Sequence, residues 1–217
     1  MERFKINMFQ CIVRVHPSAV VSLKDIDKTL TVPHKCFAPG SLGKEVVEKD
    51  THQFGSISLK MKLNDLNISV LLFNTHKIKI SGGLNIVKDT SDGDLDRMLK
   101  TDIIEPIILI LYSKEQGYEL EKKMVNAIMY RSRSIGKDNF MQFIEKLKKQ
   151  FIGHHIIMPD IMLKNGNRRG RICAVKVKIP HGKGQFAVDH GGNVQFFSYD
   201  CLYNLQKHKS ELMNVWL

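Results

Sequence analysis

One strand-turn-strand pattern occurs twice in this chain, and that duplication restricts the possible folds more than any other feature. Lys60 and Lys176 lie 116 residues apart, and Lys62 and Lys178 have the same spacing. Around each pair, lysine or serine alternates with apolar residues, which is typical of a strand with one buried face. At this spacing and without a gap, each strand is followed by an apolar segment, a short turn and a second apolar segment: 68–73, 74–76 and 77–81 in the first copy, 184–189, 190–192 and 193–197 in the second. The sequence therefore predicts a duplicated half-fold.

The first half contains further predicted elements on both sides of the paired strands. After those strands, Gly82 and Gly83 suit a tight strand-to-helix turn that needs positive φ. The following apolar run predicts a helix that is broken or entered at Pro106. The elements expected outside the paired strands are a strand at 9–15, a short helix at 22–29, a loop rich in Gly, Pro and charge at 33–52, and a long helix that begins in the acidic stretch 89–96 and runs to 111.

The second half repeats this order. A strand is expected at 124–131, an amphipathic helix at 139–150, further strands from Arg171 onward and a closing helix at 200–213. The halves, residues 1–115 and 116–217, are expected to join edge to edge. The expected fold class is α+β: two pseudo-symmetric halves form a curved antiparallel sheet, a saddle, with helices on its convex side and the other face open.

The open face of the first half combines aromatic and basic residues. Simple alternation assigns eight residues to it: Phe54, Ser56, Ser58, Lys60, Lys62, Phe73, Lys79 and Ser81. Two bulky aromatics among lysines and serines are unusual on an exposed sheet. The alternative is that loops cover Phe54 and Phe73 and make them part of the core.

The charge of the chain favours an anionic partner. Thirty-three Lys and Arg residues against 22 Asp and Glu residues give a formal net charge of +11, which suits nucleic acid. A solvated basic surface without that role is the alternative. The basic segment 165–171, which ends in Arg171, is either a solvated turn or a loop that binds phosphate.

Several other classes of protein are disfavoured by the residues. The four cysteines are scattered without a CxxC pair, so we expect no zinc site, no disulfide framework and a reducing compartment. The histidines at 154, 155, 181 and 190 have no ligand partners at suitable spacing, and we expect no metal and no cofactor. No nucleophile-base or paired-carboxylate arrangement stands out, so we do not expect an enzyme. No apolar run approaches the roughly 20 residues of a membrane span.

The segment from Ser69 to Gly83, SVLLFNTHKIKISGG, resembles a stretch of the TATA-box-binding proteins and their diverged relatives in large DNA viruses. Phe73 falls at a position where that family carries a wedge phenylalanine, and Phe54, upstream, falls at the other. Residues 10–15 are similar to the family's first strand, with Gln10 in place of its groove-reading asparagine. In the second half, Asn126 matches the family's base-contacting asparagine.

This resemblance implies a transcription initiation factor that binds A/T-rich promoter DNA in the minor groove. In that mode apolar wedges enter base steps and bend the duplex, while polar and basic residues contact base edges and phosphates. Phe54 and Phe73 would be the wedges, and Gln10, Ser81 and Asn126 would contact bases or sugars. The phosphate-binding residues would be Lys60, Lys62, Lys79 and Arg171. The implied partners are a factor-B-like protein and RNA polymerase, and the implied site of action is the nucleus or a viral replication site.

The second half departs from the family pattern. At the constant spacing Phe54 corresponds to Gly170 and Phe73 to Asp189, so both wedges are missing there. A one-residue change of register would bring Phe196 or Phe197 to the surface instead. The competing hypothesis is therefore an interaction module of the same fold that binds transcription proteins without DNA. A third is an accessory domain of a nucleic-acid enzyme whose catalytic part lies on another chain.

Overall fold

The computed structural model describes residues 3–17, 22–30, 44–52, 55–86, 90–131, 134–158, 174–180 and 184–216. The chain forms two compact units. The N-terminal unit comprises residues 8–84 and 90–124, and the C-terminal unit comprises residues 1–7, 85–89 and 125–217. Two long strands, β1 (Arg3–His16) and β6 (Gly117–Tyr130), contribute residues to both units.

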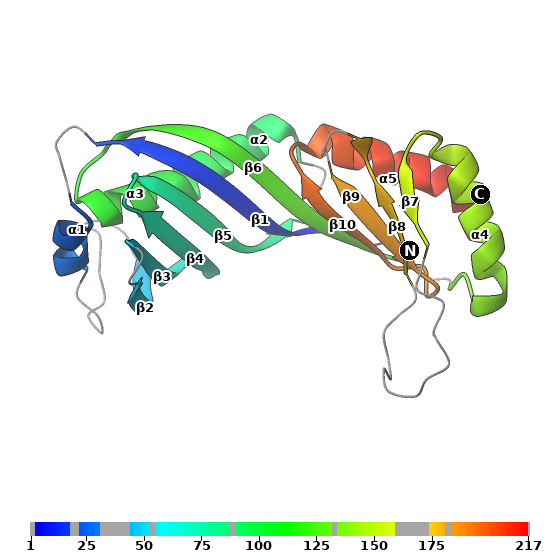
Figure 1. The fold of residues 1–217 in the computed structure, drawn as a ribbon, viewed down its shortest axis with the longest axis horizontal. Coiled ribbons are helices and arrows are strands. Elements are labelled where there is room, and N and C mark those ends of the chain that lie inside the picture. The colour runs from blue at the N-terminus through cyan, green and yellow to red at the C-terminus, as the bar shows by residue number, and fades with distance from the viewer. Residues whose placement is uncertain are drawn as a thin grey trace. The chain divides into compact units, whose positions relative to one another are not determined.

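The N-terminal unit is a sheet with helices (Figure 1). Its strands pair in the order β2-β3-β4-β5-β1-β6. The elements other than β1 and β6 are α1 (Leu23–Thr29), β2 (Lys44–His52), β3 (Ser56–Leu63), β4 (Leu66–Phe73), β5 (Lys77–Ile86), α2 (Asp92–Met98), the π-helical segment η1 (Leu99–Ile104) and α3 (Glu105–Tyr112).

The C-terminal unit repeats this plan with fewer residues. Its strands continue the pairing in the order β6-β10-β9-β8-β7, and each pairing from β10 to β7 is antiparallel. The elements are α4 (Lys137–Gln150), β7 (His155–Ile157), β8 (Ala174–Lys178), β9 (Gln185–Asp189), β10 (Val194–Tyr199) and α5 (Leu202–Trp216). The mixed α/β fold with a large antiparallel sheet is thus confirmed.

Two elements of the first half differ from the sequence expectation. Residues 44–52, expected as loop, form the edge strand β2 paired with β3. Gly82 and Gly83, expected in a turn, lie inside β5. A Cβ built on Gly82 would lie 2.9 Å from Cε1 of Phe9, so this glycine serves close packing against an aromatic ring rather than positive φ.

The long helix is confirmed and contains an irregular turn. Ser91 caps α2, because its hydroxyl accepts a hydrogen bond from the backbone N–H of Asp94 at 3.1 Å. The chain then widens into η1, where the N–H of Glu105 bonds to the carbonyl of Lys100. Pro106 follows in the first turn of α3, where a residue without an N–H is tolerated.

The two repeats agree in register at one hairpin and differ at the other. Leu72 pairs with Ile78, and Val188 pairs with Val194, which preserves the spacing of 116. In the adjoining pair, however, Leu59 faces Val70 while Val177 faces Phe186, so β8 matches β3 at a spacing of 118. The expectation of a gap-free repeat is therefore wrong for this strand.

The physical reason for the offset is the length of chain between the paired positions. Ten residues separate Leu59 from its partner Val70, whereas eight separate Val177 from its partner Phe186, so the second repeat is two residues shorter here. At the corrected spacing, position 54 corresponds to 172 rather than to Gly170; positions 54, 170 and 172 lie outside the described residues. Because the offset is two residues, each strand still presents the same face.

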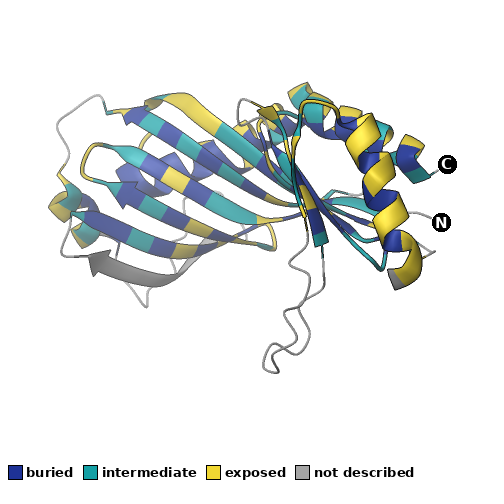
Figure 2. Cartoon of the chain, turned by 45° about the vertical axis from the view of Figure 1, so that its right-hand side comes forward, coloured by how far each residue is buried: buried dark blue, intermediate teal, exposed yellow. Residues whose placement is uncertain are grey.

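Burial alternates along the strands and identifies the covered face (Figure 2). In β3, Ile57, Leu59, Met61 and Leu63 are at most 1% exposed, whereas Lys60 and Lys62 between them are exposed. In α4, the predicted apolar face, Phe140, Phe143, Ile144 and Leu147, is buried, which confirms the amphipathic helix. Within the described ranges, no helix is both long and apolar enough to cross a membrane.

Candidate nucleic-acid interface

The face of the N-terminal sheet opposite the core carries the predicted lysines. Lys60 and Lys62 on β3 and Lys79 on β5 are exposed, and each lies between buried apolar neighbours. Ser69 on β4 pairs with both Lys60 and Ser81. Alternation thus fixes this face, and the predicted lysines and Ser81 lie together on it.

Phe73 is the last residue of β4 and is partly exposed. Its cross-strand partner is Ser56, which is only 8% exposed although alternation assigned it to the open face. Phe54, the other predicted wedge, lies outside the described residues. The structure therefore presents one aromatic side chain at the predicted position, at the end of a strand.

Hydrogen bonds hold the hairpin that follows Phe73. The carbonyl of Phe73 accepts from the N–H of His76 at 3.0 Å, and the carbonyl of His76 accepts from the N–H of Val15 at 3.0 Å. The His76 ring contacts the Tyr112 hydroxyl, with Nδ1 and Oη 3.0 Å apart. Burial raises the pKa of Tyr112 to about 12, so its hydroxyl stays protonated at neutral pH. These contacts hold the end of β4, and with it Phe73, in place.

A charged cluster on this face was missed by the sequence analysis. The Glu121 carboxylate accepts a hydrogen bond from Arg14 Nε at 2.6 Å and forms an ion pair with Lys77 Nζ at 2.9 Å. These hydrogen bonds, from Lys77 first and then Arg14, hold the pKa of Glu121 below its usual value. The three residues lie far apart in the chain, so no sequence spacing connects them.

The predicted base-reading residues have different surroundings. Gln10 on β1 is half-buried on the open face, between buried Phe9 and Cys11. Asn126 on β6, in the other unit, already has a structural partner: its Oδ1 accepts a hydrogen bond from the backbone N–H of Ser198 at 2.8 Å. Asn126 therefore holds a neighbouring strand in addition to any contact with a ligand.

Ser198 lies in a β-bulge between Phe196 and Tyr199, with a φ of 58°. The bulge keeps both of those aromatic residues fully buried. Phe197, in contrast, is partly exposed and pairs with Gln185 on β9. This pairing keeps the spacing of 116, because Ser81 pairs with Ser69 in the first repeat. Phe197 rather than Phe196 therefore lies toward the surface without the change of register considered from the sequence.

Asp189, which replaces a wedge in the second repeat, is engaged in its own turn. Its Oδ1 accepts from the backbone N–H of Asn193 at 2.9 Å and its Oδ2 from Asn193 Nδ2 at 3.0 Å. The carbonyl of the next residue, His190, accepts from Ser134 Oγ at 3.0 Å and from the N–H of Gly136 at 3.1 Å. The carboxylate thus shapes a turn.

The basic residues of the C-terminal unit lie on another strand. Lys176 and Lys178 are exposed on β8, and Arg171 lies outside the described residues.

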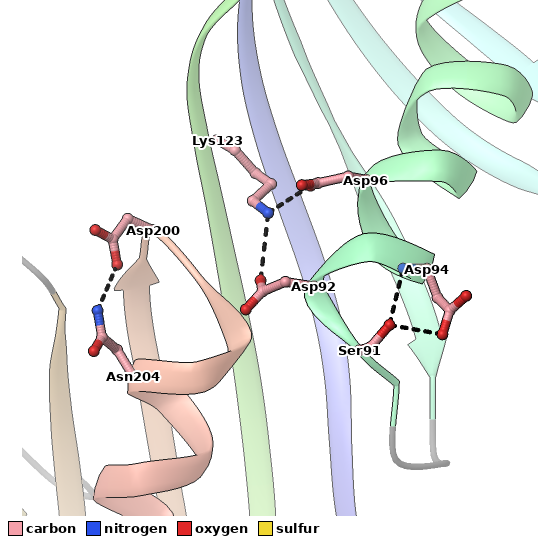
Figure 3. A network of polar contacts seen from close by, with 7 residues as sticks. All are labelled: Ser91, Asp92, Asp94, Asp96, Lys123, Asp200 and Asn204. Atoms are coloured by element: carbon pink, nitrogen blue, oxygen red, sulfur yellow. Dashed lines mark hydrogen bonds and ion pairs between the residues drawn. The ribbon is translucent and has the colours of Figure 1, made fainter.

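The covered side of the N-terminal sheet is anchored by a lysine (Figure 3). Lys123 of β6 reaches two carboxylates of α2, with Nζ 2.5 Å from Asp96 and 3.4 Å from Asp92. Burial alone would lower the pKa of Lys123, but these two carboxylates outweigh it and raise the pKa. Lys123 is therefore committed to packing the helix on the sheet.

The described residues contain no group of three or more His, Cys, Asp or Glu side chains that could hold a metal ion. Of the four histidines considered above as ligands, His154 and His190 are partly exposed, His155 is exposed, and His181 lies outside the described residues. A further histidine, His208 of α5, is buried among Phe151, Tyr199 and His154. It is an aromatic packing residue that sequence reasoning did not single out.

Comparison with solved structures defines the class of fold. The chain has the fold of the TATA-box-binding proteins: its structure is similar to that of Methanococcus jannaschii TBP, with a TM-score of 0.50 and 9% sequence identity, over 98% of this chain and 97% of that one. No protein-family model matches the chain, and no curated protein matches it by sequence. At this identity the likeness establishes the fold.

Proposed function

We propose that this chain is a non-enzymatic, TBP-like protein that binds double-stranded DNA through the open face of its sheet and acts in transcription initiation. One observation carries the proposal: Lys60, Lys62 and Lys79 are exposed together on the face opposite the core, with the aromatic side chain of Phe73 at a strand end. Minor-groove binding explains a basic sheet with a partly exposed aromatic residue better than a solvated surface without a ligand does.

The proposed mechanism assigns separate roles to the aromatic and basic residues. Phe73 would enter a base step, which costs a few kcal/mol of unstacking. Lys60, Lys62 and Lys79 would compensate by neutralising phosphates and releasing counterions, so the affinity would fall steeply with salt. Gln10 and Ser81 would contact base edges or sugars from the same face.

The proposed binding is asymmetric between the two units. The C-terminal unit has a hydrogen-bonded carboxylate at Asp189, where the first repeat has a phenylalanine. Phe197 is its partly exposed aromatic residue on the corresponding strand β10. We therefore assign the stronger kink to the N-terminal unit and give Lys176 and Lys178 a role in phosphate contact.

The proposal includes partners. A/T-rich promoter DNA, a factor-B-like protein and RNA polymerase are proposed from the resemblance, as is action in the nucleus or at a viral replication site. The similar solved structure is archaeal, so the likeness to viral relatives depends on the sequence motifs alone.

The test is fluorescence-detected binding and bending of end-labelled duplexes, A/T-rich against G/C-rich, across a salt series. Salt-dependent binding with a bend that favours the A/T-rich duplex is the expected result. No binding at low salt would reject the proposal and favour the module that binds transcription proteins without DNA. Binding without a bend would reject the minor-groove wedge.

A further inference from the structure

Three charged side chains from neighbouring strands meet on the open face of the N-terminal unit. Strands β5, β1 and β6 are adjacent in the sheet and supply Lys77, Arg14 and Glu121 respectively. Oε1 of Glu121 lies 2.6 Å from Arg14 Nε, and its Oε2 lies 2.9 Å from Lys77 Nζ. One carboxylate therefore bridges two cations, with one oxygen for each.

The position of the cluster is fixed by the burial of its neighbours. Arg14 lies between the buried Val13 and Val15, and Lys77 precedes the buried Ile78, so both cations lie on the face opposite the core. The side chains of Arg14, Lys77 and Glu121 are 39%, 37% and 22% exposed. A ligand on the open face can therefore reach all three.

The chemistry of the bridge matches that of a phosphate. A phosphodiester, like a carboxylate, presents two anionic oxygens that accept hydrogen bonds from separate donors, and Arg and Lys are its usual protein partners. We propose that Arg14 and Lys77 form a phosphate-binding site that Glu121 occupies in the free protein, and that a DNA phosphate displaces this carboxylate. The inference depends on the proposed function for the identity of its natural ligand.

The exchange is energetically feasible because the ion pairs are exposed to solvent. Pairs of this kind contribute little to stability, since solvent screens them and two flexible side chains must be ordered. Lys77 and Arg14 keep the pKa of Glu121 low, so protonation does not vacate the site at neutral pH. A competing anion must therefore displace a charged carboxylate. In the free protein this carboxylate reduces the net positive charge that the site offers to DNA.

The direct test is Glu121→Gln, which preserves the shape of the side chain and removes its charge. DNA affinity at about 100 mM salt is expected to rise three- to tenfold, and the slope of log K against log salt to become steeper by about one, because one more counterion is released. Glu119→Gln is the matched control, since Glu119 is exposed on the same strand, two residues away. Removal of that charge is expected to change the affinity less than twofold.

A second set of variants identifies the cations. Adding Arg14→Ala and Lys77→Ala to Glu121→Gln is expected to abolish the gain in affinity and return the salt slope to the wild-type value or below. Equal affinities and slopes for Glu121→Gln and Glu119→Gln would overturn the inference. Weaker binding by Glu121→Gln would also overturn it, because Glu121 would then be orienting Arg14 and Lys77 for DNA.

A measurement without DNA separates this inference from the proposed function. Tripolyphosphate is titrated into the wild type, Glu121→Gln and Glu119→Gln while the Arg14 Nε–H resonance is followed by NMR. Tighter binding by Glu121→Gln alone, with a shift of that resonance, supports the phosphate site even if no duplex binds. Identical titrations for the three proteins, or shifts that spare Arg14, would reject the site whether or not DNA binds.

Discussion

The backbone N–H of Ser198 donates to Oδ1 of Asn126 across the β10–β6 pair, at 2.8 Å. Asn126 was singled out in the sequence as a base-contacting residue, yet here it also stabilises a β-bulge on the neighbouring strand. That bulge keeps Phe196 and Tyr199 in the core while Phe197 turns toward the surface. One side chain thus connects the packing of the C-terminal unit with its open face.

Asn126→Ala should destabilise the protein by about 0.5–1.5 kcal/mol, because the N–H of Ser198 loses its hydrogen-bond acceptor at an exposed bulge. Asn126→Asp retains an acceptor and should unfold near the wild-type denaturant concentration, yet bind DNA more weakly because its carboxylate repels phosphate. Chemical denaturation and duplex binding of both variants measure these effects. Wild-type stability of Asn126→Ala would show that the hydrogen bond contributes nothing to the bulge.

Phe73→Ala should reduce DNA bending more than it reduces binding, because the side chain acts as a wedge rather than as a phosphate contact. Lys60→Ala should do the reverse and lower the salt slope by about one. Fluorescence energy transfer across an end-labelled duplex reports bending, and anisotropy reports binding. Lys146→Ala, on the exposed side of α4, is the charge control. Equal loss of bending in Phe73→Ala and Lys60→Ala would contradict the wedge role.

Gly82→Ala and Gly93→Ala should change stability in opposite directions. At Gly82 a Cβ would lie 2.9 Å from the Phe9 ring and 3.1 Å from the carbonyl oxygen of Asn67, so we expect a loss of about 1–3 kcal/mol. At Gly93, within α2, the nearest atom is 3.9 Å away, and alanine should add about 0.5–1 kcal/mol through helix propensity. Thermal unfolding of the two variants checks the pair. A thermal midpoint of Gly82→Ala equal to that of the wild type would contradict this, because the Phe9 ring would then have shifted to make room for the added methyl group.

The buried His208 should make stability depend on pH between about 6.5 and 4. Burial, with smaller contributions from the charges of His154 and Lys207, lowers the pKa of His208 to about 4. Its folded pKa lies below the unfolded value, so its contribution is complete above about pH 6.5 and is lost as the pH falls toward 4. Glu211, whose Oε2 is 4.0 Å from His208 Nε2, opposes the shift only weakly.

The matching variant is His208→Phe, which fills the same aromatic site without a titrating group. The wild type should lose on the order of 2 kcal/mol more than this variant between pH 7 and pH 4.5. Urea unfolding at several pH values measures the difference. Parallel stability curves for the two proteins would show that His208 does not govern this part of the acid response.

The sequence predicted those elements whose pattern is local. Alternation in β3 and the apolar face of α4 determine both elements without help from distant residues, and both were confirmed. Strand β2 was missed because its residues show no period of two. Its backbone pairs with β3 from Lys44–Leu63 to His52–Ser56, so this strand depends on its neighbour rather than on a pattern in its own sequence.

The candidate site could be predicted only in part for a similar reason. Lys60, Lys62 and Lys79 belong to a single hairpin region, so alternation placed them on one face correctly. The bridge of Arg14, Lys77 and Glu121 joins three strands through tertiary pairing, and nothing in the spacing of these residues indicates it. The role of Asp189 was likewise hidden, because its partner Asn193 is recognisable only once the turn is seen.

The two-residue offset between β3 and β8 has a consequence for how such a duplicated protein can diverge. Side chains alternate across a strand, so a difference of one residue between β8 and β9 would have exchanged Lys176 and Lys178 with Val175 and Val177. The second repeat is shorter by two residues instead, and both sets keep their faces. The connection between two such strands can therefore change in length by two residues while the core is preserved, whereas a change of one requires a bulge such as that at Ser198.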